Sequence, residues 1–310
     1  MIRNGCVTRH GWCRIFTVVL LLFFAAANTF AADRKVTIIK SSNNSYFQQT
    51  IETIKGTIGN SVTVEITDVD AIETEQKSVE DSDLIITLGN RAAQKVNQDF
   101  ENLPVIHAYV TLKQQQAFPP NQSNRTTVLL NQPISRYLAF SRYLLDIQSI
   151  GIMSQSRLIL NQTQDKILEE LKLSLNQYQL KLTDSLLTSL RRLLKQNDAL
   201  LMLPDQSIYN RDTLKGVLLT SYRHRIPVIS YSPAHVKSGA LASIYSSPTD
   251  IGNQIGELLN DFLIDSRKFR SRTLFASYYS IATNMKVARA LNLNLPDEGK
   301  LREKIGEFLK

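Results

Sequence analysis

The segment from residue 83 to residue 89 reads Asp-Leu-Ile-Ile-Thr-Leu-Gly and carries the strongest structural signal in the sequence. Its apolar residues do not alternate with polar ones, so both faces of the extended chain are apolar. Such a run is typical of a strand in a parallel sheet that is covered by helices on both sides. The glycine that follows indicates a turn. This segment therefore predicts an α/β fold.

On both sides of this strand, short β-branched runs alternate with helical patterns, which favours parallel sheets covered by helices. A polar stretch at 113–125, rich in Gln, Pro and Asn, separates two such series. In the first series, strands are expected at 36–39, 62–66, 83–88 and 104–110, and helices at 47–58 and 91–97. In the second, strands are expected at 150–153, 179–182, 198–203 and 226–231, and helices at 134–147, 165–175, 185–195 and 211–222. A helix from residue 247, a strand at 279–282 and a helix at 284–291 complete the pattern.

A chain of 310 residues exceeds what one hydrophobic core usually serves. We therefore expect two Rossmann-like α/β lobes with parallel sheets. The first lobe comprises residues 32–128 plus 243–275, and the second comprises 129–242 plus 276–310. Nothing in the sequence repeats at the period of a solenoid protein.

The first 31 residues have the pattern of a secretory signal peptide. Arg3, Arg9 and Arg14 precede a 13-residue apolar run, and small residues follow it near Ala31. Thirteen helical residues reach about 20 Å, less than the roughly 30 Å of a bilayer core. We therefore expect cleavage near Ala31 and a periplasmic protein; the alternative that remains is an uncleaved membrane anchor.

Charge and cysteine content exclude several classes of protein. The formal charge is +8, from 36 basic and 28 acidic residues, and no block of five or more basic residues occurs. Nucleic acid is therefore not an expected partner. Both cysteines, Cys6 and Cys13, lie in the expected signal peptide. The mature chain then has no disulfide and no thiolate ligand. We expect it to bind no metal or cofactor and to be a monomer.

Enzyme motifs are missing from the sequence. There is no His-Glu-x-x-His, no Gly-x-Ser-x-Gly, no phosphate-binding loop and no Gly-x-Gly-x-x-Gly after a strand. His107 lies within an expected strand, where a hydrogen-bonded core residue is a better interpretation than a catalytic base. We therefore assign no catalytic residue and do not expect an enzyme.

Polar residues gather where the expected strands end. In open α/β sheets, small ligands bind at the carboxyl ends of the strands, beside helix N-termini that suit an anionic group. Asp205 would suit an ammonium group. Taken one at a time, these positions are ordinary loop residues; their common edge makes them candidates. The candidate ligand-binding residues are Ser41, Asn43, Tyr46, Gly89, Asn90 and Thr111 in the first lobe, and Ser154, Gln155, Asp205, Tyr231 and Ser232 in the second.

Several segments in order resemble a family of ABC-transporter substrate-binding proteins, the tryptophan/tyrosine type. The resemblance is carried by residues 197–209 (Asn-Asp-Ala-Leu-Leu-Met-Leu-Pro-Asp-Gln-Ser-Ile-Tyr), 225–232, 236–241, 250–254 and 282–296. Asp205 matches an acidic position of the family, and Ser232 matches a polar position after a strand. Two segments depart from the family pattern, namely 89–92 and 111–114.

This resemblance implies the architecture of type I periplasmic binding proteins, with two lobes, three crossovers and a cleft between the lobes. It implies an exported solute-binding protein that captures a small, amino-acid-like ligand and delivers it to a membrane ABC permease. The alternative is a periplasmic sensory or accessory module of the same fold that docks on a membrane partner. Loss of the polar lining over residues 89–116 would favour that alternative.

Overall fold

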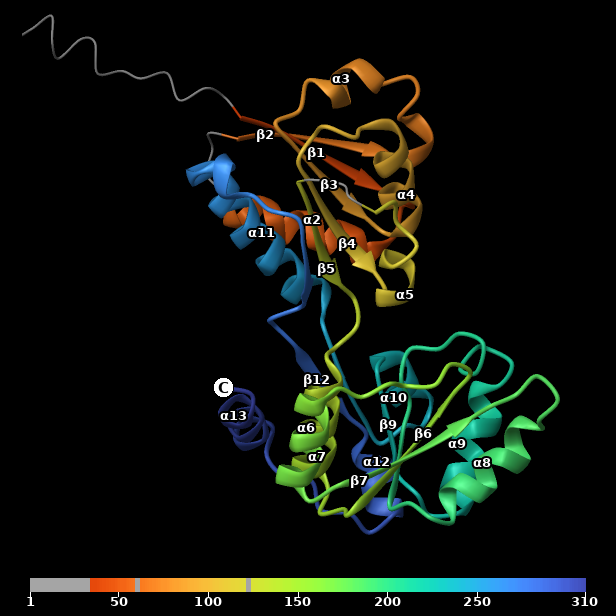
Figure 1. Cartoon of the computed structure of the whole chain (residues 1–310). Helices are drawn as coiled ribbons and strands as arrows, with labels where there is room; N and C mark the ends of the chain where they lie inside the picture. Colours follow the sequence, from red (N-terminus) through yellow and green to blue (C-terminus); the bar gives the residue numbers. More distant parts are fainter. Residues whose placement is uncertain (1–33, 59–61, 121–123) are drawn as a thin grey trace, which may run out of the picture.

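The computed structural model of the protein describes residues 34–58, 62–120 and 124–310. The expected signal peptide and its cleavage point lie outside these residues. The described chain forms two α/β lobes joined by three crossing segments (Figure 1). The expected fold of two lobes with parallel sheets is confirmed.

Lobe 1 is a six-stranded sheet in the order β11-β5-β4-β3-β1-β2, in which every pair is parallel. Its strands are β1 (Arg34–Lys40), β2 (Val62–Asp68), β3 (Leu84–Leu88), β4 (Val105–Val110), β5 (Arg125–Leu129) and β11 (Arg272–Phe275). Its helices are α2 (Ser45–Thr57), α3 (Gln76–Glu80), α4 (Asn90–Asp99), α5 (Leu112–Gln115) and α11 (Pro248–Ile264), with short 3-10 turns at Val69–Ala71 and Ser266–Lys268.

Lobe 2 is a second six-stranded sheet in the order β12-β10-β9-β8-β6-β7, parallel except for β12 against β10. Its strands are β6 (Ser149–Ser154), β7 (Ser174–Gln179), β8 (Ala199–Leu201), β9 (Val228–Ser230), β10 (Ala242–Tyr245) and β12 (Ser280–Thr283). Its helices are α6 (Ile134–Leu144), α7 (Gln162–Leu171), α8 (Leu186–Leu194), α9 (Leu214–Arg223), α10 (Pro233–Ser238), α12 (Met285–Ala290) and α13 (Glu298–Phe308).

Each sheet has an apolar core on both faces, as the nearly continuous apolar runs predicted. All five residues of β3 are buried, and they contribute to the cores on the two sides of their sheet. In lobe 1, α2 and α11 cover one face and α3 and α4 the other. In lobe 2, α6, α7 and α13 cover one face and α8, α9 and α10 the other. This is the arrangement seen in Figure 1.

The chain crosses between the lobes at residues 130–133, 246–247 and 276–279. The first two crossings leave the carboxyl ends of β5 and β10, and the third leaves the carboxyl end of β11. The carboxyl edges of both sheets therefore lie toward the crossings. The boundary expected after residue 242 falls inside β10, because Ala242 and Ser243 pair with β9 in the sheet of lobe 2. This crossing therefore begins at Ser246.

A close approach of two helices fixes the outer layer of lobe 1. Gly252 of α11 faces Thr53 of α2, and a Cβ atom on Gly252 would lie 2.6 Å from Thr53 Cβ and 3.0 Å from the backbone oxygen of Thr50. Gly256, one turn later, approaches Thr57 in the same way. Two glycines spaced by four residues thus let α11 lie directly on α2.

Gly252→Ala is expected to lower the free energy of unfolding by about 1–3 kcal/mol, because the added methyl group meets backbone that cannot move aside. Gly306→Ala in α13 is the matched control, since no atom lies within 4 Å of its added Cβ. The control is expected to be neutral or to stabilise by about 0.5–1 kcal/mol. Urea denaturation measures both; an equal response of the two variants would refute the packing argument.

Candidate functional site

The candidate residues of lobe 2 come together at the carboxyl edge of its sheet. Asp205, after β8, accepts a hydrogen bond from the backbone amide of Gln155, after β6, at 3.1 Å through Oδ2. Its Oδ1 accepts from the backbone amide of Ser207 at 3.1 Å and from the Ser207 hydroxyl. The side chain of Asp205 is half-buried. Three donors therefore hold this carboxylate in one orientation at the edge.

Tyr231, after β9, lies beside the same carboxylate. Burial, and then the nearby charge of Asp205, raise the pKa of the Tyr231 phenol. The Tyr231 ring packs edge-on against His235, with 4.8 Å between the ring centroids. An anion and an aromatic surface are thus adjacent in lobe 2.

Two other candidates in lobe 2 serve the local fold. The Ser154 hydroxyl donates to the backbone oxygen of Ser156 at 2.8 Å and accepts from Gln177 Nε2 at 2.8 Å. Ser232 is the N-cap of α10, where its hydroxyl accepts from the amide of Ala234 at 3.3 Å. Both residues stand at strand ends, but local hydrogen bonds already engage their hydroxyl groups.

In lobe 1, Ser41, Gly89 and Asn90 meet at the start of α4. The Ser41 hydroxyl accepts from the amide of Ala92 at 2.9 Å and so binds the first turn of the helix. Gly89 has φ of 97°, and a Cβ atom there would lie 2.6 Å from Ser41 Oγ, so only glycine fits. The Oδ1 atom of Asn90 is buried and has no hydrogen-bond partner among the described residues. The start of α4 therefore carries an unsatisfied acceptor beside helix amide groups.

The remaining candidates of lobe 1 form other contacts or are exposed. Asn43 is exposed and accepts from Gln48 Nε2 at 3.2 Å. Thr111 forms a capping box with Gln114 at the start of α5, whereas the Gln, Pro and Asn content of 113–125 predicts a loop. Tyr46 is 58% exposed, in the first turn of α2.

Sequence reasoning missed Tyr109, at the end of β4. Its backbone has φ of 58° at an irregular point in the pairing of β4 with β5. Its hydroxyl lies 2.5 Å from Thr50 Oγ1, and its ring packs edge-on against Phe47 at 5.0 Å. Burial raises the pKa of this phenol to about 12. Strained backbone of this kind is concentrated at binding and active sites. The sequence did not indicate Tyr109 because it lies within an apolar strand pattern.

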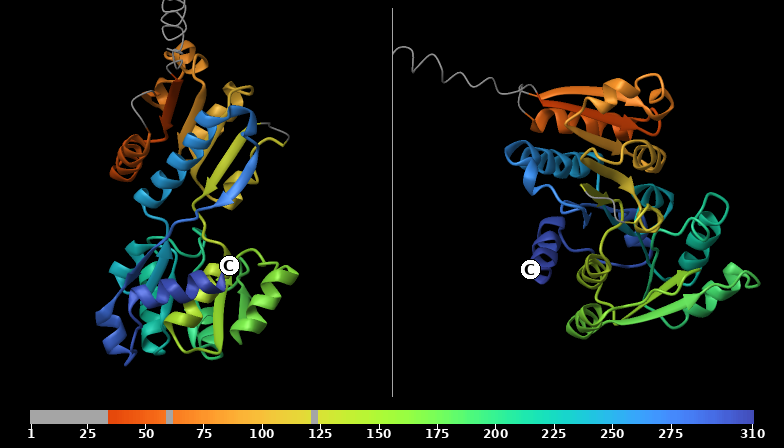
Figure 2. Two further views of the ribbon diagram at one scale, coloured as in Figure 1. Left: turned by 90° about the vertical axis from the view of Figure 1, so that its left-hand side faces the viewer. Right: turned by 45° about the horizontal axis from the view of Figure 1, so that its top comes forward.

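The three crossings are tied to one another. The Ser246 hydroxyl accepts from Gln132 Nε2 at 2.8 Å and donates to the backbone oxygen of Tyr278 at 2.7 Å. These three residues belong to the three crossings, which lie side by side between the lobes (Figure 2). Arg136 of α6 also donates to the backbone oxygen of Ala276 at 2.7 Å.

The third crossing is held from both lobes. The Tyr279 ring lies between the guanidinium groups of Arg136 and Arg302, at 4.9 and 5.1 Å. On the other side, α11 of lobe 1 binds this region through Asp250 Oδ2, which accepts from the Ser280 hydroxyl at 2.7 Å. Gln254 of α11 accepts from the Ser277 amide at 2.8 Å. The angle between the lobes is thus set by specific contacts.

Ser246→Ala is expected to loosen the lobes, because it removes one hydrogen bond to each of the other two crossings. The Nε2 group of the buried Gln132 loses its acceptor, which costs about 1–3 kcal/mol of stability, while its Oε1 still accepts from Arg136. Spin labels at Lys77 and Thr188, exposed on α3 and α8, measure the effect. We expect a broader distribution of label distances in the unliganded variant than in the wild type.

Ser238→Ala is the control for this experiment. Its hydroxyl donates to the backbone oxygen of Ala234 within α10, away from the crossings. The control should keep the wild-type distance distribution. An unchanged distribution in Ser246→Ala would mean that these hydrogen bonds do not set the angle between the lobes.

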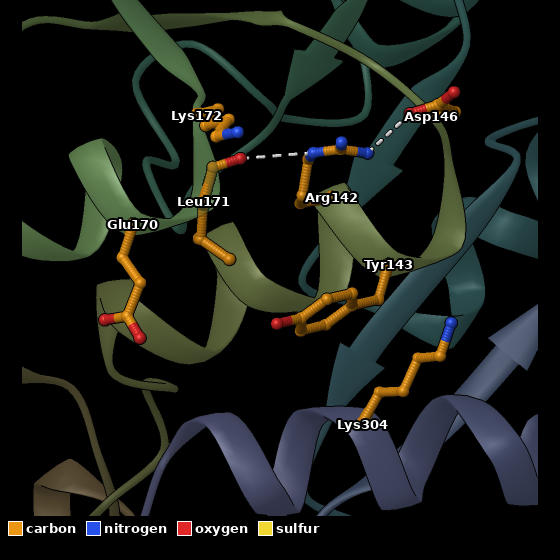
Figure 3. A pocket seen from close by; sticks show the side chains of 7 residues that line it. All are labelled: Arg142, Tyr143, Asp146, Glu170, Leu171, Lys172 and Lys304. Carbon is orange, nitrogen blue, oxygen red and sulfur yellow. Dashed lines mark hydrogen bonds and ion pairs between the residues drawn. The ribbon is translucent and has the colours of Figure 1, made fainter.

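A separate hollow of about 430 Å³ lies away from the candidate residues, between α6, the end of α7 and α13 (Figure 3). Arg142 in it already donates to the backbone oxygen of Leu171 at 3.1 Å and pairs with Asp146 at 2.7 Å. The hollow stands at the amino edge of the sheet of lobe 2, because Asp146 and Leu171, which line it, precede β6 and β7. We therefore do not take it for the ligand site.

His107 is a core residue rather than a base. It is fully buried, with Nδ1 2.7 Å from Thr87 Oγ1 and Nε2 3.0 Å from Asn97 Oδ1. In the described segments, His, Cys, Asp and Glu side chains form no group of three or more that could hold a metal ion. Within those same segments, no helix is long and apolar enough to cross a membrane.

Two α/β lobes, three crossings and polar strand ends turned toward the crossings define a two-lobed binding protein. A family model for ABC transporter substrate-binding proteins matches residues 60–298. The chain belongs to this family, as its motifs indicated, and it is a substrate-binding component of ABC transport rather than a member of an enzyme family. No curated protein sequence matches the chain.

Solved structures share the fold at low identity. A protein described as the ABC domain in complex with L-Trp from Streptococcus pneumonia is 18% identical, with a TM-score of 0.55 over 88% of this chain and 98% of that one. A ligand-free, open substrate-binding protein with adhesive properties from Clostridium difficile is 14% identical, with a TM-score of 0.65 over 86% and 97%. A periplasmic ribose ABC transporter from Conexibacter woesei is 14% identical, with a TM-score of 0.52 over 87% and 97%.

Proposed function

We propose that this protein captures a small, amino-acid-like solute between its lobes and delivers it to a membrane ABC permease. The observation that carries the proposal is the carboxylate of Asp205, which three donors hold at the carboxyl edge of lobe 2. Each carboxylate oxygen can accept two hydrogen bonds. Oδ2, with one donor from Gln155, keeps capacity for the ammonium group of a ligand.

The carboxylate of such a ligand would bind on lobe 1. The first turn of α4 offers amide groups that lack partners within the helix, and the helix dipole favours an anion there. The unsatisfied Oδ1 of Asn90 would accept an N–H group of the same ligand. A zwitterion would thus have its two charges matched by opposite lobes, and its binding would favour their approach.

Aromatic side chains support a ligand with an apolar or aromatic part. Tyr46 and Tyr109 in lobe 1 and Tyr231 in lobe 2 stand at the carboxyl edges of the sheets. Burial of an apolar side chain against aromatic rings contributes affinity beyond that of the two charges. The resemblance to the tryptophan/tyrosine type and the L-Trp in one structural relative point in the same direction.

Export and cleavage near Ala31 are part of this proposal, because the permease would receive the solute from the periplasmic side. N-terminal sequencing of the protein from the periplasmic fraction should give a start at Ala32 or Asp33. An intact N-terminus in the membrane fraction would instead identify an anchored protein. We propose that the exported protein acts as a monomer.

Thermal unfolding against a panel of L-amino acids, their decarboxylated amines and sugars tests the ligand class. A ligand at 100 times its dissociation constant stabilises the folded state by about 2.7 kcal/mol, which is a resolvable shift of melting temperature. We expect shifts with L-amino acids, largest for apolar or aromatic ones, and smaller shifts with the amines. Shifts with sugars alone would contradict the amino-acid-like ligand.

A second function has one observation in its favour. Ser41, Thr111 and Ser232, three of the polar residues expected to line the site, already cap helices or turns. A module that docks on a membrane partner without a ligand would need no free polar lining. The absence of any shift over the whole panel would favour this sensory or accessory role.

A further inference from the structure

Two adjacent helices cover one face of the sheet in lobe 2. Leu190 and Leu193 of α8 and Val217 and Leu218 of α9 are buried in the same core. The two helices touch where Leu187 packs beside Gly216. Both therefore turn their opposite sides outward from the same layer, as the positions of α8 and α9 in Figure 1 show.

The outward sides of these helices form one exposed surface, which we call the α8–α9 face. Its spacing is that of a single helix side in each case, at i, i+3, i+4 and i+7 in α8 and at i, i+4, i+7 and i+8 in α9. The α8–α9 face consists of Thr188, Arg191, Arg192 and Lys195, and of Lys215, Leu219, Tyr222 and Arg223, all of them exposed.

This face is strongly basic. From residue 185 to residue 225 the chain has seven Lys or Arg and three Asp. Two of these acids, Asp198 and Asp205, accept backbone hydrogen bonds at the two strand edges of the sheet. The third acid, Asp212, lies just before α9 beside the face and is exposed.

The basic residues of the α8–α9 face also lack partners. Ten ion pairs are formed among the described residues, and none of them involves a residue between 147 and 264. Elsewhere in the same described chain, basic residues such as Lys35, Lys95 and Arg302 pair with acids. The charge of this face is therefore available to an external partner.

Apolar groups lie within the basic surface. Leu219 and Tyr222 are 43% and 49% exposed, on the same side of α9 as Lys215 and Arg223. Aromatic and aliphatic groups flanked by Lys and Arg are typical of surfaces that lie in the headgroup region of a membrane. A basic surface that binds an acidic protein through charge alone does not require exposed apolar groups. The exposed apolar groups of this face therefore favour a membrane over an acidic protein.

We propose that the α8–α9 face docks on the anionic lipid surface of the membrane at which the permease operates. Arg191, Arg192 and Lys195 contact lipid phosphates, as do Lys215 and Arg223 on the neighbouring helix. Leu219 and Tyr222 enter the headgroup layer. The face covers the broad side of the sheet, whereas Asp205 lies at a strand edge, so docking leaves the candidate ligand site open. Retention at the membrane raises the local concentration of the protein near its permease.

Sedimentation with vesicles tests the proposal. We expect the purified protein to bind vesicles of phosphatidylcholine with 30% phosphatidylglycerol at low salt, to leave them in 0.5 M salt, and to ignore pure phosphatidylcholine. Each basic residue near an anionic surface strengthens binding by roughly fivefold. The triple variant Arg191→Gln, Arg192→Gln, Lys195→Gln should therefore bind roughly a hundredfold more weakly.

A matched control separates this face from net charge. Lys166, Lys300 and Lys304 are exposed on α7 and α13, and replacing all three by Gln removes the same charge. This control should keep wild-type binding, whereas Tyr222→Ser should weaken binding several-fold at constant charge. Because no solute is present, the result is independent of the proposed ligand.

Three outcomes would overturn the proposal. The first is equal weakening in the two triple variants, which would mean that overall charge attracts the protein. The second is equal binding to charged and uncharged vesicles. The third is failure to bind the anionic vesicles together with binding of an acidic polypeptide such as polyglutamate, which would identify an acidic protein as the partner.

Discussion

Asp205→Asn is expected to weaken the binding of an amino-acid ligand by about 30-fold to several-thousand-fold. Removing one partner of a desolvated charge pair costs about 2–5 kcal/mol, largely because the other charge stays buried and unpaired. The Asn side chain keeps the shape and one acceptor oxygen for Ser207 or Gln155. The amide nitrogen that replaces the other oxygen would face a donor, so a moderate fall in melting temperature without ligand is also expected. Titration calorimetry with the amino acid that gives the largest thermal shift measures the loss.

Asp198→Asn is the matched control for this prediction. Asp198 also lies in lobe 2 and also accepts backbone amides, those of Gln148 and Ser149, both at 2.9 Å. It stands at the amino edge of the sheet, away from the candidate site. Its replacement should lower stability and leave ligand affinity unchanged. If Asp205→Asn binds the ligand as tightly as the wild type does, the carboxylate only stabilises the turn.

The parallel sheets could be predicted because their inner strands are buried on both faces. The run that includes Leu200 has no polar residue and the run that includes Ile85 has only Thr87, since helices cover both sides. The prediction of a strand at 179–182 was wrong. The strand is β7, Ser174–Gln179, an edge strand whose half-buried surface admits polar residues and so lacks an apolar run. Lys172 ends α7 in a left-handed conformation, with φ of 50°, which no helical pattern reveals.

β5 was missed because polar residues occupy a buried strand. Arg125 is 7% exposed and donates to the backbone oxygens of Phe100 and Leu103, and the Thr126 hydroxyl donates to the backbone oxygen of Arg270 at 2.9 Å. Distant parts of the chain supply these acceptors, so the local sequence suggests a loop. The adjacent strand β11 was missed for a related reason, since it is a mostly exposed edge strand.

The strand ends of the candidate site could be predicted, but the availability of their side chains could not. Ser41 and Thr111 stand at strand ends, yet both are engaged with a helix. The contact of Ser41 with Ala92 of α4 joins distant parts of the chain, so only the three-dimensional structure reveals it. The fixed orientation of Asp205 depends on Gln155, fifty residues away in sequence. Such pairings arise from the order of the strands, in which β8 lies beside β6.

The pH dependence of stability is expected to arise in part from His107. Asn97 Oδ1 can only accept, so His107 Nε2 donates to it; in the neutral ring, Nδ1 then accepts from the Thr87 hydroxyl. Both ring nitrogens of this buried side chain thus have a partner when the ring is neutral. Burial, with a smaller effect of the nearby Arg125 charge, lowers the pKa of His107 from 6.5 to about 3. Protonation in the folded state would place a second positive charge beside Arg125 in the core.

Acidification from pH 6.5 toward pH 3 is therefore expected to destabilise the fold. Between these pH values the unfolded chain binds a proton at His107 that the folded chain does not. The stability contributed by the neutral His107 is therefore fully present above about pH 6.5 and is lost as the pH falls. It falls by about 1.4 kcal/mol per pH unit, or roughly 4–5 kcal/mol in total. Urea unfolding at pH 7.5 and pH 4.5 should show a loss of about 2–3 kcal/mol from this residue.

His107→Gln separates this effect from that of the carboxyl groups, which titrate in the same range. The variant is expected to be less stable at neutral pH, because Gln cannot fill the imidazole site, but its loss of stability down to pH 4.5 should be smaller than that of the wild type by about 2–3 kcal/mol. An identical slope in His107→Gln and the wild type would mean that the imidazole accepts a proton in the folded protein, and the neutral hydrogen-bonded core described for His107 would be wrong.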